Sequence, residues 1–182
     1  MGRPRRFDRD AALDQALQLF WEQGYDATSI ADLTRALGIS APSLYAAFGD
    51  KRALFDEAVA RYEASPRSVT TAGTAGRTPR EVLGAMLDVA VREYVDEDHP
   101  RGCLVNSSPE LADRRAANRA ATAAHVAQVT GVAADPDPGR DPATLAAFAH
   151  ALLIGLSSSA RDGADGAQLA RIAELALRAV PE

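Results

Sequence analysis

The side chains best suited to touching a nucleic acid gather at the start of one short expected helix. They are Ser40, Ala41, Pro42, Ser43 and Tyr45. Small side chains let a helix approach base edges closely in the DNA major groove, and Ala or Pro can touch a thymine methyl group. The free N–H groups of a helix N-terminus suit a phosphate. This segment is a candidate DNA-reading element, and a plain helical corner is the alternative that these residues alone leave open.

Two short helices must position this segment. The first is expected to begin at residues 28–29, Thr-Ser, which are good N-cap types, and to end before a tight turn at residues 38–40, Gly-Ile-Ser. The second should occupy residues 41–48 and end at a glycine. Two helices joined by a short Gly-containing turn form the helix-turn-helix pattern, whose second helix enters the major groove.

The composition of the 182-residue chain favours an all-α fold. Hydrophobic residues make up 47% and charged residues 25%, while aromatic residues, which favour strands, make up only 5%. Alanine, the strongest helix former, is abundant, and apolar residues recur at helical spacing with no convincing strand. We expect about nine helices, the three short ones first. Residues 65–78, rich in Gly and hydroxyl side chains, are expected to form a mobile loop.

The net charge of −5 means that any nucleic-acid contact must come from a local basic feature. Such a feature is the N-terminal arm with Arg3 and Arg5, which can enter an adjacent minor groove; a solvated chain end is the alternative.

Other classes of site are disfavoured. One Cys and three His without metal-ligand spacing predict no metal and no cofactor. The motifs of hydrolases, phosphate loops and dinucleotide sites are missing, which predicts no enzyme activity and no catalytic residue. No apolar run approaches the ~18 residues of a membrane span and no signal peptide is evident, so we expect a cytoplasmic protein with no membrane partner.

Residues 3–59 read together carry a more specific signal. The motifs are Gly24-Tyr25, Ala27-Thr28-Ser29-Ile30, Leu37-Gly38-Ile39-Ser40 and the run Leu44-Tyr45, Phe48, Lys51, Leu54-Phe55. This stretch resembles the N-terminal DNA-binding domain of the tetracycline-repressor (TetR) family of transcriptional regulators. The resemblance implies a helix-turn-helix domain with its arm over residues 1–49, a connecting helix over residues 50–64, and a ligand-binding and dimerisation domain over residues 65–182.

The resemblance also implies DNA contacts at matching positions. These are Thr28 for a phosphate, Ser40 to Ser43 on the recognition helix, and Tyr45 and Lys51 for phosphates. Ala46 and Ala47 stand where many relatives carry larger polar residues. We therefore expect fewer side-chain hydrogen bonds to bases and more use of backbone contacts, DNA shape and the arm.

The resemblance assigns the last two helices to a homodimer interface. The expected contact residues are Leu145, Ala149, Leu152, Gly155, Leu156, Leu169, Ile172 and Ala176. Small residues at four-residue spacing, such as Ala151, Gly155 and Ser159, let another helix approach closely. Packing within one chain is the alternative. A two-fold dimer would place two recognition helices about one DNA turn, roughly 34–36 Å, apart on a palindrome.

A small-molecule effector pocket is expected among the helices of the C-terminal part. Candidate lining residues are Met86, Leu87, Tyr94, Cys103, Asn118, Thr122, His125, Phe148 and Leu152. A polar stripe of Arg115, Asn118, Thr122 and His125 falls at helical spacing. If the stripe faces inward, it gives an apolar cavity a few convergent polar groups; if it faces outward, it is a solvated helix face.

These features predict a homodimeric regulator, most simply a repressor, that leaves a palindromic double-stranded DNA operator when an unknown small molecule binds. Activation instead of repression stays open. One alternative is a redox sensor acting through Cys103, which follows His99 and Arg101 and is otherwise a small buried apolar residue. Another is a small-molecule-binding helical protein or enzyme with a vestigial DNA-binding head.

Overall fold

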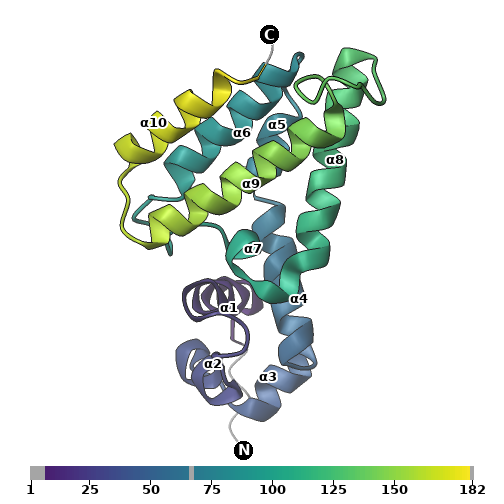
Figure 1. Cartoon of the computed structure of the whole chain (residues 1–182). Coiled ribbons are helices and arrows are strands. Elements are labelled where there is room, and N and C mark those ends of the chain that lie inside the picture. Colours follow the sequence, from purple (N-terminus) through teal and green to yellow (C-terminus); the bar gives the residue numbers. More distant parts are fainter. Residues whose placement is uncertain (1–6, 66–67, 181–182) are drawn as a thin grey trace, which may run out of the picture. The chain divides into compact units, whose positions relative to one another are not determined.

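The computed structural model describes residues 7–65 and 68–180, and these ranges hold ten α-helices, one short 3-10 helix and no strand (Figure 1). The chain divides into two compact units, Met1–Ala64 and Ser65–Glu182. The first unit contains α1 (Arg9–Gln23), α2 (Ile30–Leu37), α3 (Ala41–Phe48) and α4 (Lys51–Glu63). The second contains α5 (Val69–Gly73), α6 (Pro79–Glu93), α7 (Leu104–Ser107), η1 (Pro109–Leu111), α8 (Ala112–Thr130), α9 (Pro142–Arg161) and α10 (Gly166–Leu177). The expected all-α class is confirmed.

The first unit is held together by the apolar face of α1 packed on α4. α1 begins after Asp8, whose carboxylate accepts hydrogen bonds from the N–H groups of Asp10 and Ala11. Phe20 of α1 and Phe55 of α4 are fully buried, and their rings meet edge to face with centroids 5.1 Å apart. An aromatic pair of this geometry adds about 0.5–1.5 kcal/mol beyond its buried area. This contact fixes α4 against α1.

A charged bridge joins the start of α1 to α3 and α4. The Arg9 guanidinium donates two hydrogen bonds to the Glu57 carboxylate, at 2.6 and 2.7 Å, and one to the Ala47 carbonyl at 3.3 Å. It also lies 4.5 Å from the centroid of the Phe48 ring. The bond from Arg9 lowers the pKa of Glu57. Because both side chains are partly exposed and solvent screens their attraction, the bridge serves mainly to orient α3.

Local caps and one glycine define the turn between α2 and α3. The Ser29 hydroxyl accepts a hydrogen bond from the Asp32 N–H, and the Asp32 carboxylate accepts one from the Ser29 N–H, forming a capping box. Gly38 ends α2 in the left-handed conformation with φ of 64°. Ser40 then caps α3 by accepting a hydrogen bond from the Ser43 N–H. The two caps set where both helices of the helix-turn-helix begin.

Substitution of Gly38 tests this turn. No atom lies within 4 Å of the position that a Cβ would take, so the cost of a side chain comes from the backbone conformation alone. We expect Gly38→Ala to lower the free energy of unfolding by about 1 kcal/mol and Gly38→Asn to lower it less, since Asn tolerates the left-handed region. Urea unfolding followed by the fluorescence of Trp21, the single Trp, measures both. An Ala variant as stable as the wild type would show that residue 38 does not adopt the left-handed conformation.

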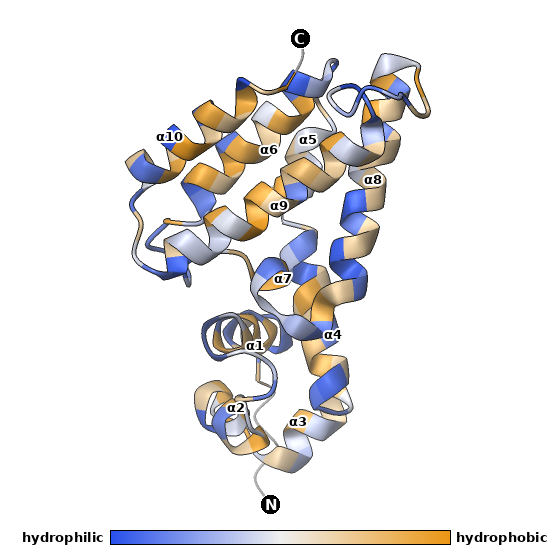
Figure 2. Cartoon of the chain, viewed as in Figure 1, coloured by the Kyte–Doolittle hydropathy of each residue, from blue (hydrophilic) through white to orange (hydrophobic). Residues whose placement is uncertain are grey.

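The second unit is organised around α6 and α9. α6 lies between α9 and α10, and α9 also packs on α7 and α8 (Figure 1). Hydrophobic residues follow α6, α9 and α10 along their lengths (Figure 2). The fully enclosed side chains include Leu83, Met86 and Leu87 of α6 and Leu156 of α9. Their burial makes this three-helix layer the core of the unit.

Residues 68–78, the larger described part of the segment expected to be a mobile loop, correct one expectation. In place of a mobile loop, the short helix α5 forms here and packs on α6 and α8. A Cβ on Gly73 would lie 2.8 Å from the Met86 Cγ, and a Cβ on Gly76 would lie 2.4 Å from the Val82 nitrogen. The small residues that indicated flexibility in the sequence therefore permit close packing against α6.

α9 corrects a second expectation, that no segment is apolar enough to span a membrane. Its 20 residues pass that test by length and composition, with a mean hydropathy of 1.5. In the fold, 44% of its most apolar 18-residue stretch is buried inside the unit. The core helix of a folded domain can be as long and as apolar as a membrane span. α9 packs on α6, α7, α8 and α10.

Candidate DNA-binding interface and ligand cavity

α3 presents an uncharged outward surface. The expected DNA-contacting residues on α3 and its N-cap are exposed or half-exposed: Ser40, Ala41, Pro42, Ser43 and Tyr45. Lys51, at the start of α4, is half-exposed. The Ser40 and Ser43 hydroxyl oxygens lie 2.9 Å apart, and the Tyr45 side chain is 48% exposed. Leu44 and Phe48 are buried on the opposite side and hold α3 on the unit. The arrangement leaves small hydroxyl side chains and one phenol free to meet DNA.

Thr28 does not belong to this surface, which corrects its expected role as a phosphate contact. Its side chain is fully buried, and its hydroxyl donates a hydrogen bond to the Gly24 carbonyl at 2.7 Å. An enclosed hydroxyl of this kind cannot reach a phosphate unless the turn before α2 opens. Thr28 therefore supports that turn. The exposed hydroxyl at this point of the chain belongs to Ser29, the N-cap of α2.

Lys51, the first residue of α4, is held in place by an aromatic ring. Its ammonium nitrogen lies 4.1 Å from the centroid of the Tyr25 ring, in a cation–π contact. Tyr25 in turn packs on Phe55, with centroids 4.9 Å apart. The charge is thus positioned by the core of the unit. Arg3 and Arg5, the other cations expected to touch DNA, lie outside the described residues.

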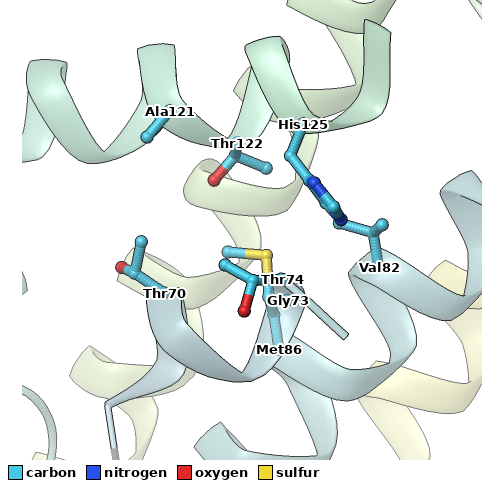
Figure 3. A pocket seen from close by; sticks show the side chains of 8 residues that line it. All are labelled: Thr70, Gly73, Thr74, Val82, Met86, Ala121, Thr122 and His125. Carbon is cyan, nitrogen blue, oxygen red and sulfur yellow. The ribbon is translucent and has the colours of Figure 1, made fainter. Parts of the chain in front are cut away.

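A cavity lies in the second unit between α5, α6 and α8. It is lined by Thr70, Gly73, Thr74, Val82, Met86, Ala121, Thr122 and His125. The space open to the centre of a water molecule is about 40 Å³, and the whole hollow with its open mouth is about 250 Å³. Figure 3 shows Thr122 and His125 of α8 facing Thr70, Thr74 and Met86 across the hollow. None of these lining residues carries a fixed charge.

Hydrogen bonds orient the polar groups of the α8 wall. The Thr122 hydroxyl donates to the Asn118 carbonyl at 3.0 Å and lies 3.0 Å from the His150 Nε2. Because the hydroxyl proton is already used, Nε2 of His150 is the donor. The His125 Nε2 donates to the Gly76 carbonyl at 3.1 Å, which leaves Nδ1 as the second polar atom of the ring.

Burial makes the stability of this wall depend on pH. Desolvation, with the positive charge of Arg119, holds the pKa of His150 below the ordinary value of 6.5. As the pH falls below about 6.5, the unfolded chain takes up a proton that the folded chain does not, so the free energy of unfolding falls until the folded-state pKa is reached. Above that range both states are neutral and the effect vanishes. We expect His150→Gln to reduce the dependence of the free energy of unfolding on pH, measured by thermal unfolding at several pH values between about 5 and 7.5. An unchanged pH dependence would show that His150 is not its source.

The four residues of the polar stripe on α8 are buried or half-buried, and two of them line the cavity. Thr122 and His125 line the cavity. Arg115 donates hydrogen bonds to the carbonyls of Val105 and Ser108, at 2.9 and 2.6 Å. Asn118 contributes its carbonyl to Thr122, as described above, and does not line the cavity.

The remaining expected effector residues are only partly brought together. Met86 lines the cavity with the two α8 residues, but Leu87, Tyr94 and Cys103 are buried in the core apart from it. Phe148 and Leu152 line a groove on α9 and α10 instead. The lining residues that the sequence did not indicate are Thr70, Gly73, Thr74, Val82 and Ala121. Thr70, Gly73 and Thr74 belong to the segment that the sequence analysis expected to be a loop, because its apolar residues do not recur at helical spacing.

Cys103 lies in an enclosed site. It is 7% exposed, and its N–H donates a hydrogen bond to the Ser157 hydroxyl at 2.9 Å. The adjacent Tyr94 phenol accepts a hydrogen bond from the Asn106 amide at 3.3 Å. Burial, together with the neighbouring Cys103, raises the pKa of Tyr94 well above its ordinary value. These surroundings favour a structural Cys103 over a thiol open to oxidants.

α9 and α10 share an apolar groove. It is lined by Phe148, Ala151, Leu152, Gly155, Leu156, Ser159 and Ile172, with a volume of about 330 Å³. Large apolar side chains lie exposed on the same two helices: Ile154 at 43%, Ile172 at 36% and Leu175 at 67%. Apolar side chains gathered on one surface mark a contact with another protein.

Half of the expected dimer residues are buried within the unit. Leu145, Ala149, Leu156 and Leu169 are at most 3% exposed, because their own chain encloses them. Leu152, Gly155, Ile172 and Ala176 are exposed or half-exposed, so their place in a dimer interface stays a prediction. The apolar residues of α9 surround the helix, so sequence periodicity could not separate its inner face from its outer face.

A grouping of titratable residues at the end of α6 was not indicated by the sequence. Ligand atoms of Glu93, Asp96 and His99 all lie within 4.8 Å of one another. The His99 Nε2 lies 3.6 Å from the Glu93 carboxylate, and Nδ1 lies 3.1 Å from the Pro100 carbonyl. This is the geometry of an ion pair when the imidazole is protonated.

The capped helices α2 and α3, with a small uncharged outward face on α3, define a helix-turn-helix DNA-binding protein. A family model described as bacterial regulatory proteins, tetR family, matches residues 12–58. The chain is 34% identical over 194 residues to the HTH-type transcriptional repressor ComR of Escherichia coli (strain K12), covering 100% of this chain and 92% of ComR. This chain belongs to the TetR family, as its sequence motifs predicted.

Two further relatives span the whole chain. The HTH-type transcriptional repressor BdcR of Escherichia coli (strain K12) is 35% identical over 184 residues, covering 98% of this chain and 92% of BdcR. A solved structure of a cysteine mutant of the TetR family transcriptional regulator CifR, complexed with 26bp double-strand operator DNA, is 36% identical. It superposes with a TM-score of 0.80 and covers 99% of this chain and 100% of that chain.

Proposed function

We propose that this protein is a transcriptional repressor that binds a palindromic DNA operator as a homodimer and leaves it when a small molecule occupies the second unit. The observation that carries this proposal is the similarity, over 99% of the chain, to a regulator solved with operator DNA. The exposed surface from Ser40 to Tyr45 and the positioned Lys51 support the same contact here. A cytoplasmic location and a role without enzymatic activity follow from it.

Operator binding is tested by fluorescence anisotropy on duplexes tiled across the DNA upstream of the protein's own gene. Random duplex serves as competitor at low and moderate salt, because non-specific phosphate contacts weaken steeply with salt. We expect one tile to form a saturable, competitor-resistant complex with two chains per duplex. Equal, salt-sensitive binding to all tiles and to unrelated promoter DNA would contradict a sequence-specific repressor.

Release by a ligand requires that the ligand discriminate between two states of the protein. A molecule with equal affinity for the DNA-bound and the DNA-free form shifts nothing, however tightly it binds. By linkage, operator DNA must weaken ligand binding by the same factor by which the ligand weakens operator binding. Titration of ligand with and without a saturating operator duplex measures this reciprocity.

The dimer is tested at Ile172, which is 36% exposed on α10. A two-fold interface contains each residue twice, so the loss of apolar burial in Ile172→Ala counts twice. We expect the dimer to dissociate about tenfold more readily, which corresponds to about 1.4 kcal/mol. Analytical ultracentrifugation measures the change, with Glu174→Ala, exposed on the opposite side of the same helix, as the control. A dimer as tight as the wild type would place the interface elsewhere.

A further inference from the structure

The cavity between α5, α6 and α8 has a size and a polarity that select a class of ligand. We propose that it binds a small neutral molecule of between about three and about eight non-hydrogen atoms whose polar group is a hydrogen-bond donor, the class of short-chain alcohols. The inference deepens the proposed function by naming the effector class. Binding itself can be measured without DNA, so the two can fail separately.

Volume sets the size of the ligand. A cavity needs about 10–15 Å³ of space open to the centre of a water molecule to hold one water, so the 40 Å³ here accommodates about three. The whole hollow with its mouth, 250 Å³, corresponds to about eight waters at the ~30 Å³ that each occupies in the liquid. Ligands beyond this range would require α5 to move away from α8.

The lining excludes ions. Thr, Val, Met, Ala, Gly and a single His form the wall, with no Asp, Glu, Lys or Arg among them. A carboxylate or an ammonium would lose its hydration in this hollow without meeting an opposite charge. His150, behind Thr122, is kept neutral at pH 7 by burial and supplies no charge. A neutral molecule is the only kind that this wall solvates adequately.

Two hydroxyl groups of the wall have their protons engaged by backbone carbonyls, which leaves their oxygens to accept. The Thr74 hydroxyl donates its proton to the Thr71 carbonyl at 2.7 Å, so its oxygen is left to accept. The Thr122 hydroxyl donates to the Asn118 carbonyl, and the His125 Nε2 is used by the Gly76 carbonyl, so Nδ1 is the ring nitrogen left for a ligand. Val82 and Met86 form the apolar side of the hollow. A hydroxyl on a short alkyl chain matches both sides.

Saturation-transfer NMR on the full-length protein tests this class directly, with 1-butanol as the probe. Butyrate and butylammonium, of equal length, replace the hydroxyl by a charge. Ala121→Leu narrows the mouth, while Ala124→Leu, also exposed on α8 but outside the lining, is the matched control. Thr74→Val removes one acceptor with little change of shape and should weaken binding severalfold.

The expected result is saturation transfer to 1-butanol in the wild type and in Ala124→Leu, its loss in Ala121→Leu, and little transfer to either ion. Equal transfer in Ala121→Leu and wild type would overturn the site, and stronger transfer to butyrate or butylammonium would overturn the class. No transfer to 1-butanol in a protein that binds its operator would overturn the inference and leave the proposed function standing. Saturation transfer to 1-butanol in a protein that binds no operator tile would support the ligand class and contradict the proposed function.

Discussion

Replacing Tyr45 by Glu should lower the affinity for the operator by about a hundredfold while leaving the fold intact. The side chain is 48% exposed on α3, which carries no charged residue of its own, so a carboxylate there meets phosphates with nothing to neutralise it. A two-fold dimer contains the substitution twice, and about tenfold per half-site multiplies to about a hundredfold. The magnitude of the slope of log affinity against log salt should fall by about two, because each half-site gains one negative charge that offsets one cationic contact with a phosphate.

The control for the added charge is Ala60→Glu, at an exposed position of α4 outside the helix-turn-helix. It gives the chain the same net charge, so any general repulsion by DNA appears in both variants. Tyr45→Phe separates the phenol hydroxyl from the ring. Anisotropy on the operator tile and circular dichroism measure binding and fold. Wild-type affinity in Tyr45→Glu would show that this face of α3 does not meet DNA.

The helix-turn-helix could be predicted from the sequence because its determinants are local. Ser29 caps α2 through Asp32, three residues away, and Ser40 caps α3 through Ser43, also three residues away. Gly38 makes the turn through its own backbone conformation. Both partners of each such interaction lie within a few residues in the sequence, so they can be predicted without knowledge of the tertiary fold.

The cavity could not be predicted in the same way because it is made by tertiary packing. Gly73 approaches Met86 across the segment between α5 and α6, and His125 reaches the Gly76 carbonyl from α8. A short helix with few apolar residues shows no periodicity, and only contact with α6 and α8 stabilises it. Thr28 failed for a related reason: a hydroxyl near a helix start is equally suited to a phosphate and to a backbone carbonyl, and burial decides between them.

Truncation of Phe55 should have the largest effect on stability. Its side chain is fully buried, with ring centroids 5.1 Å from Phe20 and 4.9 Å from Tyr25, so Phe55→Ala leaves a cavity where three rings meet. Removing a buried Phe costs about 3–5 kcal/mol, a large part of the 5–15 kcal/mol that typically stabilises a domain. Trp21, the single Trp, is buried in the same unit against Tyr62, so its fluorescence in urea reports this unit.

The same substitution should also weaken DNA binding under conditions where the unit stays folded. Phe55 supports the Tyr25 ring, and that ring holds the Lys51 ammonium at 4.1 Å, so a displaced ring releases the charge. Gln128→Ala, at an exposed position of α8 in the other unit and outside its cavity and groove, should change neither the Trp21 transition nor operator affinity. A loss of less than about 1 kcal/mol in Phe55→Ala would mean that the rings close over the gap. Full operator affinity in a destabilised variant would mean that Lys51 reaches its phosphate without the ring beneath it.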